Sequence, residues 1–342
     1  MTYYVFTLVF FLFDYWILAM GLNIQYGETG ILNFAYIGFV AIGAYFTGVF
    51  SLHSAKGTGQ FYILGLGLPF PLNLLLGGIA AMCLALIVAL ITLRRLRTDY
   101  LAIVLISLSL VLYDFCNNYV GLFNGADGLY NVPEPFAKPF GLNVNSFIPF
   151  FACVAGVVSL LMWFAMSRVM RSPMGRTFRA IRDDEVVAAA LGKNVFRVKL
   201  KSMLIGSFYA GVGGGLLIQF GGSFNPTAWL PGETFVVFAV LLVGGVGSNL
   251  GMFVGALLVE TLLIHLPAFL PEIPGHPGLI EYFDNALVGI VLMVMLWFRP
   301  QGVAPERLRR TQSFGVVPRD SGGTGTIGPL ASAAALELGD AP

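Results

Sequence analysis

This 342-residue sequence is poor in charged side chains, and it contains only three cysteines and three histidines. Charged residues make up 11% of it, whereas soluble domains usually carry about 25%. Cys83, Cys116 and Cys153 all lie in apolar stretches without paired spacing. They are expected to be small packing residues, so they indicate neither a redox compartment nor a metal site. The scarcity of charge argues against a water-soluble domain.

A nucleotide-binding motif is also missing. The pattern Gly-x-x-x-x-Gly-Lys-Ser/Thr occurs nowhere in the sequence, so if ATP drives this protein, another chain must hold ATP and Mg²⁺. Gly245, Gly247 and Gly251 resemble a dinucleotide fingerprint only superficially, because no strand precedes them and the last spacing is wrong. We therefore predict a non-enzymatic chain with no bound cofactor or metal and no nucleic-acid partner.

Apolar residues, by contrast, are abundant. They make up 57% of the sequence, and the mean hydropathy is +0.82. An apolar helix of about 20 residues crosses the roughly 30 Å hydrocarbon layer of a bilayer. The apolar runs are Tyr4–Leu22, Ile31–Phe50, Leu72–Leu93, Tyr100–Val120, Ser146–Met166, Leu200–Phe220, Phe235–Val246, Leu250–His265 and Ala286–Phe298. We predict an all-α polytopic membrane protein with about nine transmembrane helices, including broken or re-entrant segments.

The positions of Lys and Arg predict an orientation in the membrane. Cytoplasmic loops retain Lys and Arg, and nine of the 19 basic residues lie between Arg168 and Lys201. If this loop is cytoplasmic, alternation leaves only Lys56 and Lys138 outside. We expect an external N-terminus, a cytoplasmic C-terminus, and one transmembrane domain over residues 1–310. The Gly/Ser/Ala/Pro-rich segment 311–342 is expected to be a disordered cytoplasmic tail.

Part of the charged loop, about 168–201, has the pattern of a short soluble helix. Acidic residues in a first turn offset the helix dipole, and a glycine commonly follows the last helical residue. A helix that serves only topology fits this pattern. A docking helix that enters a groove on a partner protein fits it too. The residues concerned are Arg182, Asp183, Asp184, Glu185, Ala188, Ala189 and Gly192.

Polar residues and glycines interrupt the apolar sequence between Gly21 and Asn33. Free backbone and polar groups are tolerated at membrane depth only where protein or a watery cavity satisfies them. Two interpretations remain open: a plain turn between two spans, and a broken helix whose ends face a substrate path. In the second, Asn23, Gln25 and Asn33 would line that path.

Two further features follow from glycine spacing and isolated charge. Gly247, Gly251 and Gly255 recur every four residues, a spacing that lets helices approach closely in lipid. Glu233 precedes a predicted span, and charge in or near a span suggests function. A structural partner, a place on a substrate path and a role as proton carrier all remain open for Glu233.

Three blocks of this sequence resemble the permeases of ABC importers of the branched-chain amino acid type, the LivM-like subunits. They are GLNIQYGETGILNFAYIGFVAIGAY from Gly21, RAIRDDEVVAAALGKNVFRVKL from Arg179 and FVVFAVLLVGGVGSNLGMFVGALLVE from Phe235. The blocks occur in the family's order, and the resemblance covers roughly residues 15–305. The loop departs from the general importer pattern of Glu-Ala-Ala and a later glycine, because Glu185 is not adjacent to the alanines.

The resemblance implies a transport subunit in the plasma or inner membrane of a bacterium. Its expected partners are ABC ATPase subunits docking on the charged loop, a second permease subunit of LivH-like type and an external substrate-binding protein. Its expected substrates are branched-chain or related apolar amino acids. A permease for urea or short amides, an ion-coupled secondary transporter and a channel remain as alternatives.

Overall fold

Helices make up the regular structure of this chain in a computed structural model, which describes residues 2–53, 59–94, 98–141, 143–264, 289–290, 293–294, 297–298 and 301–304. Within these residues, six helical segments are long and apolar enough to cross a membrane: Tyr3–Gln25, Leu72–Thr92, Tyr100–Asn118, Ser146–Arg171, Val195–Gly221 and Pro226–Gly244. Tyr36–Ser51 and Asn249–Thr261 are shorter apolar helices. Isolated β-bridges join Tyr62 to Phe123 and Leu129 to Phe224, and no strand occurs in the described part.

The elements follow one another along the chain. They are α1 (Thr2–Gln25), α2 (Tyr36–Ser51), α3 (Leu72–Thr92), α4 (Thr98–Asn118), α5 (Val120–Phe123), the 3₁₀ turn η1 (Gly125–Asp127), α6 (Ala137–Phe140), α7 (Val144–Arg171), α8 (Pro173–Asp183), α9 (Glu185–Ala190), α10 (Val195–Gly221), the 3₁₀ turn η2 (Pro226–Trp229), α11 (Glu233–Gly244), α12 (Asn249–Ala256) and the π-helix η3 (Leu257–Ile264).

Local sequence explains where several helices begin and end. The Ser172 side chain caps α8, and Pro173 occupies the first turn, where no amide donor is needed. Asn194 caps α10 by accepting from the Arg197 amide at 3.0 Å. The same helix ends at Gly221, and Gly222 follows it with a φ of 65°, which suits glycine. Ser248 is the N-cap of α12, and its hydroxyl accepts from the Gly251 amide at 3.1 Å.

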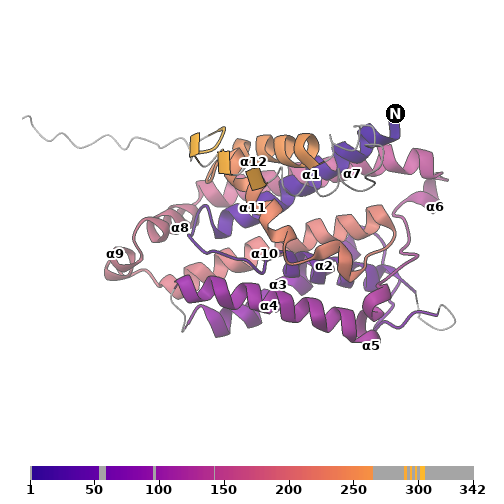
Figure 1. Cartoon of the computed structure of the whole chain (residues 1–342), viewed down its shortest axis with the longest axis horizontal. Coiled ribbons are helices and arrows are strands. Elements are labelled where there is room, and N and C mark those ends of the chain that lie inside the picture. The colour runs from indigo at the N-terminus through magenta and orange to yellow at the C-terminus, as the bar shows by residue number, and fades with distance from the viewer. Residues whose placement is uncertain are drawn as a thin grey trace, which may run out of the picture. The chain divides into compact units, whose positions relative to one another are not determined.

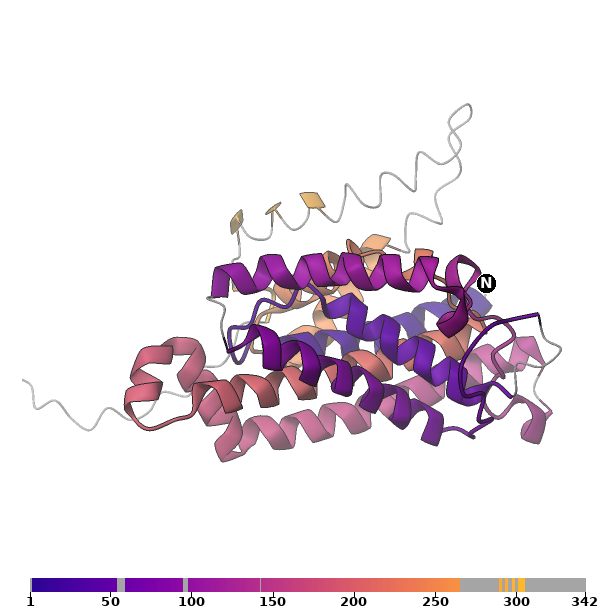
Figure 2. The ribbon, with the colours of Figure 1, turned by 90° about the horizontal axis from the view of Figure 1, so that it is seen from below.

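The long helices run alongside one another, and α8 and α9 extend from one end of them (Figure 1). Seen from below, α5 and the start of α1 lie at the opposite end from α8 and α9 (Figure 2). Helix α10 packs against α1, α2 and α3 and therefore occupies a central position. Close helix contact is a common source of stability within a membrane, where water does not drive helices together.

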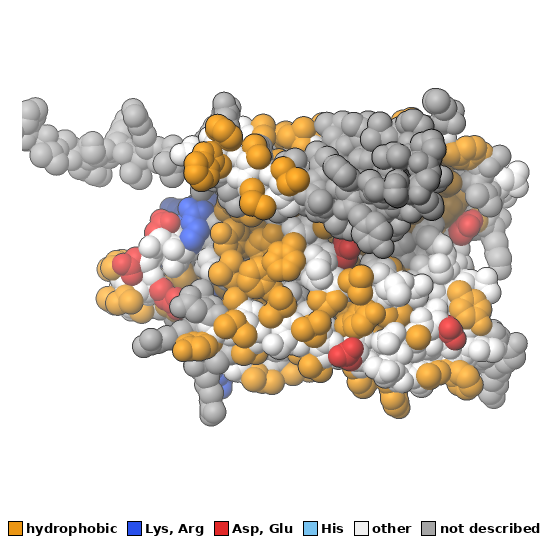
Figure 3. Space-filling view, in the orientation of Figure 1, with side chains coloured by type: hydrophobic (Ala, Val, Ile, Leu, Met, Phe, Trp, Pro, Cys, Tyr) orange, Lys and Arg blue, Asp and Glu red, His pale blue; other side chains and the backbone are white. Residues whose placement is uncertain are grey.

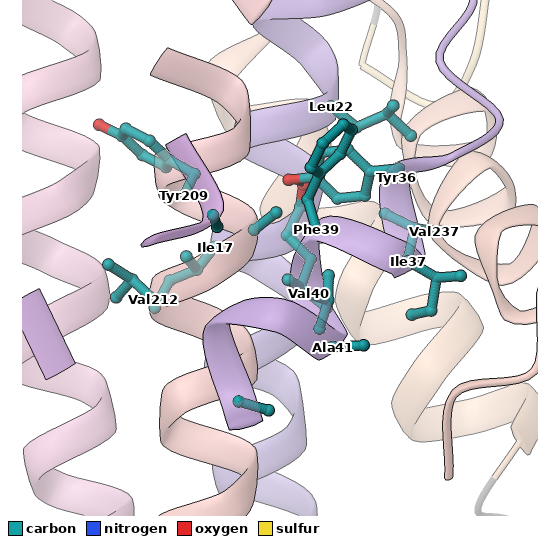
Figure 4. Close-up of a cluster of buried hydrophobic side chains, with 14 of the residues drawn as sticks. Ile17, Leu22, Tyr36, Ile37, Phe39, Val40, Ala41, Tyr209, Val212 and Val237 are labelled. Carbon is teal, nitrogen blue, oxygen red and sulfur yellow. Dashed lines mark hydrogen bonds between the residues drawn. The ribbon is translucent and has the colours of Figure 1, made fainter. Parts of the chain in front are cut away.

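Glycine residues and aromatic side chains both contribute to the contacts of α10. A Cβ atom at Gly43 of α2 would collide with the backbone of Gly211, so these helices touch backbone to backbone. On the α1 side, Phe10 stacks on Phe220 with ring centroids 3.9 Å apart. Nearby, buried side chains of α1, α2, α10 and α11 meet in one cluster, which includes Ile17 and Val237 (Figure 4).

The structure confirms the predicted all-α polytopic membrane fold, and eight of the nine predicted spans coincide with apolar helices. One boundary was wrong: α2 begins at Tyr36 and not at Ile31. The intervening backbone is held instead by hydrogen bonds to α1, such as that from the Ile31 amide to the Gln25 carbonyl at 2.8 Å. The ninth span, 286–298, lies mostly outside the described residues, and the tail 311–342 lies wholly outside them.

Candidate functional site

The charged loop contains two helices. Helix α8 ends at Asp183, and Asp184 has an extended backbone that separates it from α9. One carboxylate oxygen of Asp184 accepts from the amides of Val186 and Val187, at 2.8 and 2.9 Å. The predicted helix start at Arg182 was therefore wrong: Arg182 and Asp183 close α8, and Asp184 is the N-cap of α9. Gly192 follows α9 with a φ of 79°, as expected of a glycine after a helix.

The two faces of α9 differ sharply in exposure. Val186, Val187 and Leu191 expose 78%, 53% and 76% of their surface. Ala188 exposes only 3%, whereas Ala189 is exposed. Ala188 therefore packs against the chain itself and is not available to a partner, although the sequence analysis included it among the residues of a docking helix. The outward face is apolar and is formed by Val186, Val187 and Leu191, with Ala189 between them in sequence.

Ionic contacts connect α8 and α9 to the membrane helices. The Lys199 ammonium of α10 lies 2.7 Å from the Glu185 carboxylate of α9. The Arg179 guanidinium of α8 lies 3.2 Å from the carboxylate of Glu28, which is 2% exposed and lies in the connection between α1 and α2. Arg182 donates to the carbonyl oxygen of Gly27 in the same connection. The sequence analysis did not pair Arg179 with Glu28, since only the fold brings them together.

The α1–α2 connection, residues 26–35, is non-helical backbone beside the interior of α1. The Tyr36 hydroxyl donates to the carbonyl oxygen of Leu18 at 2.8 Å. Leu18 lies well before the end of α1 at Gln25, so α2 begins beside α1 and not beyond its end. Helix α2 is accordingly short. The non-helical connection therefore lies beside α1, and a place for it on the substrate path stays a prediction.

Hydrogen bonds join three buried polar side chains, those of Asn33, Gln25 and Ser207. The Asn33 amide donates to the Gln25 side-chain oxygen at 2.8 Å. The Gln25 amide donates to the Met203 carbonyl at 3.1 Å and to the Ser207 hydroxyl at 3.4 Å, both on α10. Gln25 and Asn33 are each 0% exposed. The structure thus brings together two of the predicted path residues, which bond to each other in this conformation.

A second break in the helices meets the first through Asn23. Its side-chain oxygen accepts from the Gly247 amide at 2.8 Å. Gly247 precedes α12 and has a φ of 79°, so it belongs to the turn between α11 and α12 and not to a helix contact. Gly251 and Gly255 do pack closely, because a Cβ atom at either would collide with the α11 backbone. The predicted glycine spacing therefore serves two purposes.

Glu233 lies in the first turn of α11 and is half-buried. Its neighbour Thr234 is buried and contacts the start of α2. The Thr234 hydroxyl accepts from the Ile37 amide and lies within hydrogen-bond distance of the Phe34 carbonyl, both at 3.3 Å. The start of α2 is thereby held to α11, on which Glu233 lies.

The comparison with protein families shows which family this chain resembles over most of its length. Residues 4–296 match the family described as the permease component of the branched-chain amino acid transport system. The chain belongs to this family. The match covers all the membrane helices described above, and the permease is therefore a transport subunit.

Curated relatives support the same conclusion. The permease is 30% identical to the high-affinity branched-chain amino acid transport system permease protein LivM of Escherichia coli, over 85% of this chain and 68% of the relative. It is 26% identical to a probable LivM of Methanocaldococcus jannaschii, over 86% and 91% of the two chains. It is also 29% identical to LivH of Salmonella typhimurium, over 84% and 90%. No solved structure matches.

These findings favour an ABC importer permease over the alternatives considered from the sequence. The matched relatives are named as amino acid transport permeases, and none of those named is a urea permease, an ion-coupled carrier or a channel. Together with the apolar helices, they support a multi-pass inner-membrane protein.

Proposed function

We propose that this permease is one of two membrane subunits of an ABC importer that carries branched-chain or related apolar amino acids inward. The exposed apolar face of α9 carries the proposal: Val186, Val187 and Leu191 lie on a charged helical projection, beyond the long apolar helices. Large apolar side chains on such a projection suggest a protein partner. The proposed partner is an ATPase with a complementary groove.

The ATPase is proposed to bind ATP and Mg²⁺, since this chain lacks the corresponding motif. It would receive α9 in a groove, in the manner of a helix that inserts a few apolar anchors. Val186, Val187 and Leu191 would be the anchors, and Ala189 would allow close approach. Asp184 shapes this surface by capping α9, and Glu185 does so by pairing with Lys199.

The proposed orientation places α8 and α9 in the cytoplasm. On the face in Figure 3, the described Lys and Arg side chains gather at the end that carries α8 and α9. The start of α1 lies at the opposite end (Figure 2). Because basic residues resist translocation, the N-terminus would be external. The cytoplasmic C-terminus proposed from the sequence rests on the Arg residues that follow the last predicted span.

The substrate path is proposed to pass the two breaks in the helices. Asn23, Gln25 and Asn33 would close its cytoplasmic side in this conformation, because their side chains bond to neighbouring elements. Glu233 would lie farther along the path, beside the membrane-embedded start of α2. Broken helices of this kind present backbone ends that suit the charged groups of an amino acid.

Copurification and transport test the proposal together. The chain is expressed with the ATPase, a LivH-like second permease and the external binding protein of the same system, and the assembly is reconstituted in vesicles. We expect the tagged chain to retain the ATPase, and the vesicles to take up labelled leucine only when ATP and the binding protein are present. Uptake of leucine without the ATPase, or uptake of urea in preference to leucine, would contradict the proposal.

A further inference from the structure

The α1–α2 connection is bonded on two sides to different parts of the protein. On one side, α8 holds it through the ion pair between Arg179 and Glu28 and through the bond from Arg182 to Gly27. On the other side, α10 holds it. The Thr29 hydroxyl donates to Ser202 at 2.8 Å, and the Ser202 hydroxyl donates to the carbonyl of Ile24 at 2.7 Å. The connection therefore lies between the charged loop and the central helix.

In the described part of the chain, the ion pair between Arg179 and Glu28 joins α8 to this connection. Its carboxylate is buried, at 2% exposure, while the arginine side chain is 33% exposed. A buried charge is costly to leave without its partner, so Glu28 will tend to follow Arg179 when α8 moves. An exposed ion pair on a flexible surface would lack this property.

The connection leads directly to the elements that would have to move during transport. It continues from Glu28 to Asn33, which bonds to Gln25, and then to the start of α2 beside Leu18. One turn before Glu28, Asn23 bonds to Gly247 and so reaches the α11–α12 turn. Displacement of Glu28 would therefore act on both helix breaks: along the chain to the start of α2, and through Asn23 and its hydrogen bond to the α11–α12 turn.

We propose that Arg179 and Glu28 are the positioning pair through which movement of α8 and α9 reaches the start of α2 inside the membrane. This inference rests on the proposed docking of an ATPase at α9. The pair does not contact substrate; it acts by holding the α1–α2 connection to α8. Without the pair, the ATPase would still bind α9 and hydrolyse ATP, but the path would open inefficiently.

The test uses the complete transporter in vesicles and measures ATP hydrolysis and leucine uptake in the same preparation. For Arg179→Gln and for Glu28→Gln we expect assembly and hydrolysis like those of the unmodified complex. We expect uptake to fall about tenfold, the size of a typical coupling between sites. The ratio of ATP hydrolysed to leucine transported then rises about tenfold. Arg176→Gln, on an exposed arginine of the same helix, is the matched control and should leave this ratio unchanged.

A charge exchange separates coupling from simple loss of stability. The double variant Glu28→Arg with Arg179→Glu should regain much of the uptake, because it restores opposite charges at the same positions. If Arg179→Gln does not assemble, Arg179→Lys is used, and an intermediate ratio is expected because lysine keeps the charge but loses the fork of donors. Hydrolysis and uptake that fall in equal proportion, or an unchanged ratio in the single variants, would overturn the inference. Failure of the unmodified complex to couple ATP to uptake would instead overturn the proposed function.

Discussion

The side-chain oxygen of Asn23 accepts a hydrogen bond from the backbone amide of Gly247 at 2.8 Å, joining two segments 224 residues apart in the sequence. Each residue lies at a break in an apolar helix. Asn23 is in the last turn of α1, and Gly247 lies between α11 and α12. The bond satisfies a backbone donor that could not continue a helix. The same hydrogen bond connects the break after α1 to the break between α11 and α12.

Replacement of Asn23 by Leu should therefore impair transport more than folding. The change removes the acceptor from the Gly247 amide, which costs about 1–3 kcal/mol where the donor stays buried. We expect the complex to assemble and leucine uptake in reconstituted vesicles to fall severalfold. Asn118→Leu is the control, because Asn118 is exposed and its amide donates within its own helix to Asp114. Normal uptake by the Asn23 variant would show that the bond is only structural.

Close packing between α11 and α12 gives a prediction about stability. A Cβ atom at Gly255 would collide with the Val240 carbonyl, whereas one at Gly221 would meet nothing within 4 Å. Gly255→Ala should therefore lower the free energy of unfolding by about 1–3 kcal/mol, a typical effect of overpacking. Gly221→Ala should change it by less than about 0.5 kcal/mol. Thermal unfolding of the purified chain in detergent compares the two, and equal melting temperatures would contradict the close helix contact.

Cysteine labelling checks the proposed orientation with residues that the structure places at opposite ends. Ala126 in η1 and Ala189 in α9 are both exposed. In intact cells, a maleimide that cannot cross the membrane should modify Ala126→Cys and should modify Ala189→Cys only after lysis. The unmodified chain, with its three native cysteines, gives the background. Labelling of Ala189→Cys alone in intact cells would show that the orientation is the reverse of the proposed one.

Much of the fold was predictable because apolar length and glycine breaks are local properties of the sequence. The spans, the end of α9 just before Gly192 and the non-helical character of the segment after Gln25 follow from such properties. The start of α2 was misplaced because Ile31 is as apolar as a helical residue would be. Its backbone is held by the Gln25 carbonyl instead, a contact that the apolar pattern does not reveal.

The partners of polar side chains were not predictable in the same way. Gln25 bonds to Ser207 and Met203 on α10, and Arg179 bonds to Glu28, over separations of more than a hundred residues. The sequence identified Gln25 as a polar interruption but could not name its partner. The inward orientation of Ala188 was missed for a related reason, since a short alanine run has no polar side chain to mark which face is buried.

The effect of a bulky residue at Ala189 on ATP-driven uptake tests the docking of α9 most directly. Ala189 is exposed beside the apolar anchors, so Ala189→Trp should leave the chain folded and inserted but block close approach of the ATPase. Ala188→Trp should instead destabilise the chain, because Ala188 is buried. Lys193→Glu should have little effect, since exposed ion pairs contribute about 0–1 kcal/mol. In vesicles that contain the complete transporter, we predict that Ala189→Trp abolishes ATP-dependent leucine uptake and weakens ATPase retention; undiminished uptake with normal ATPase retention would contradict the account.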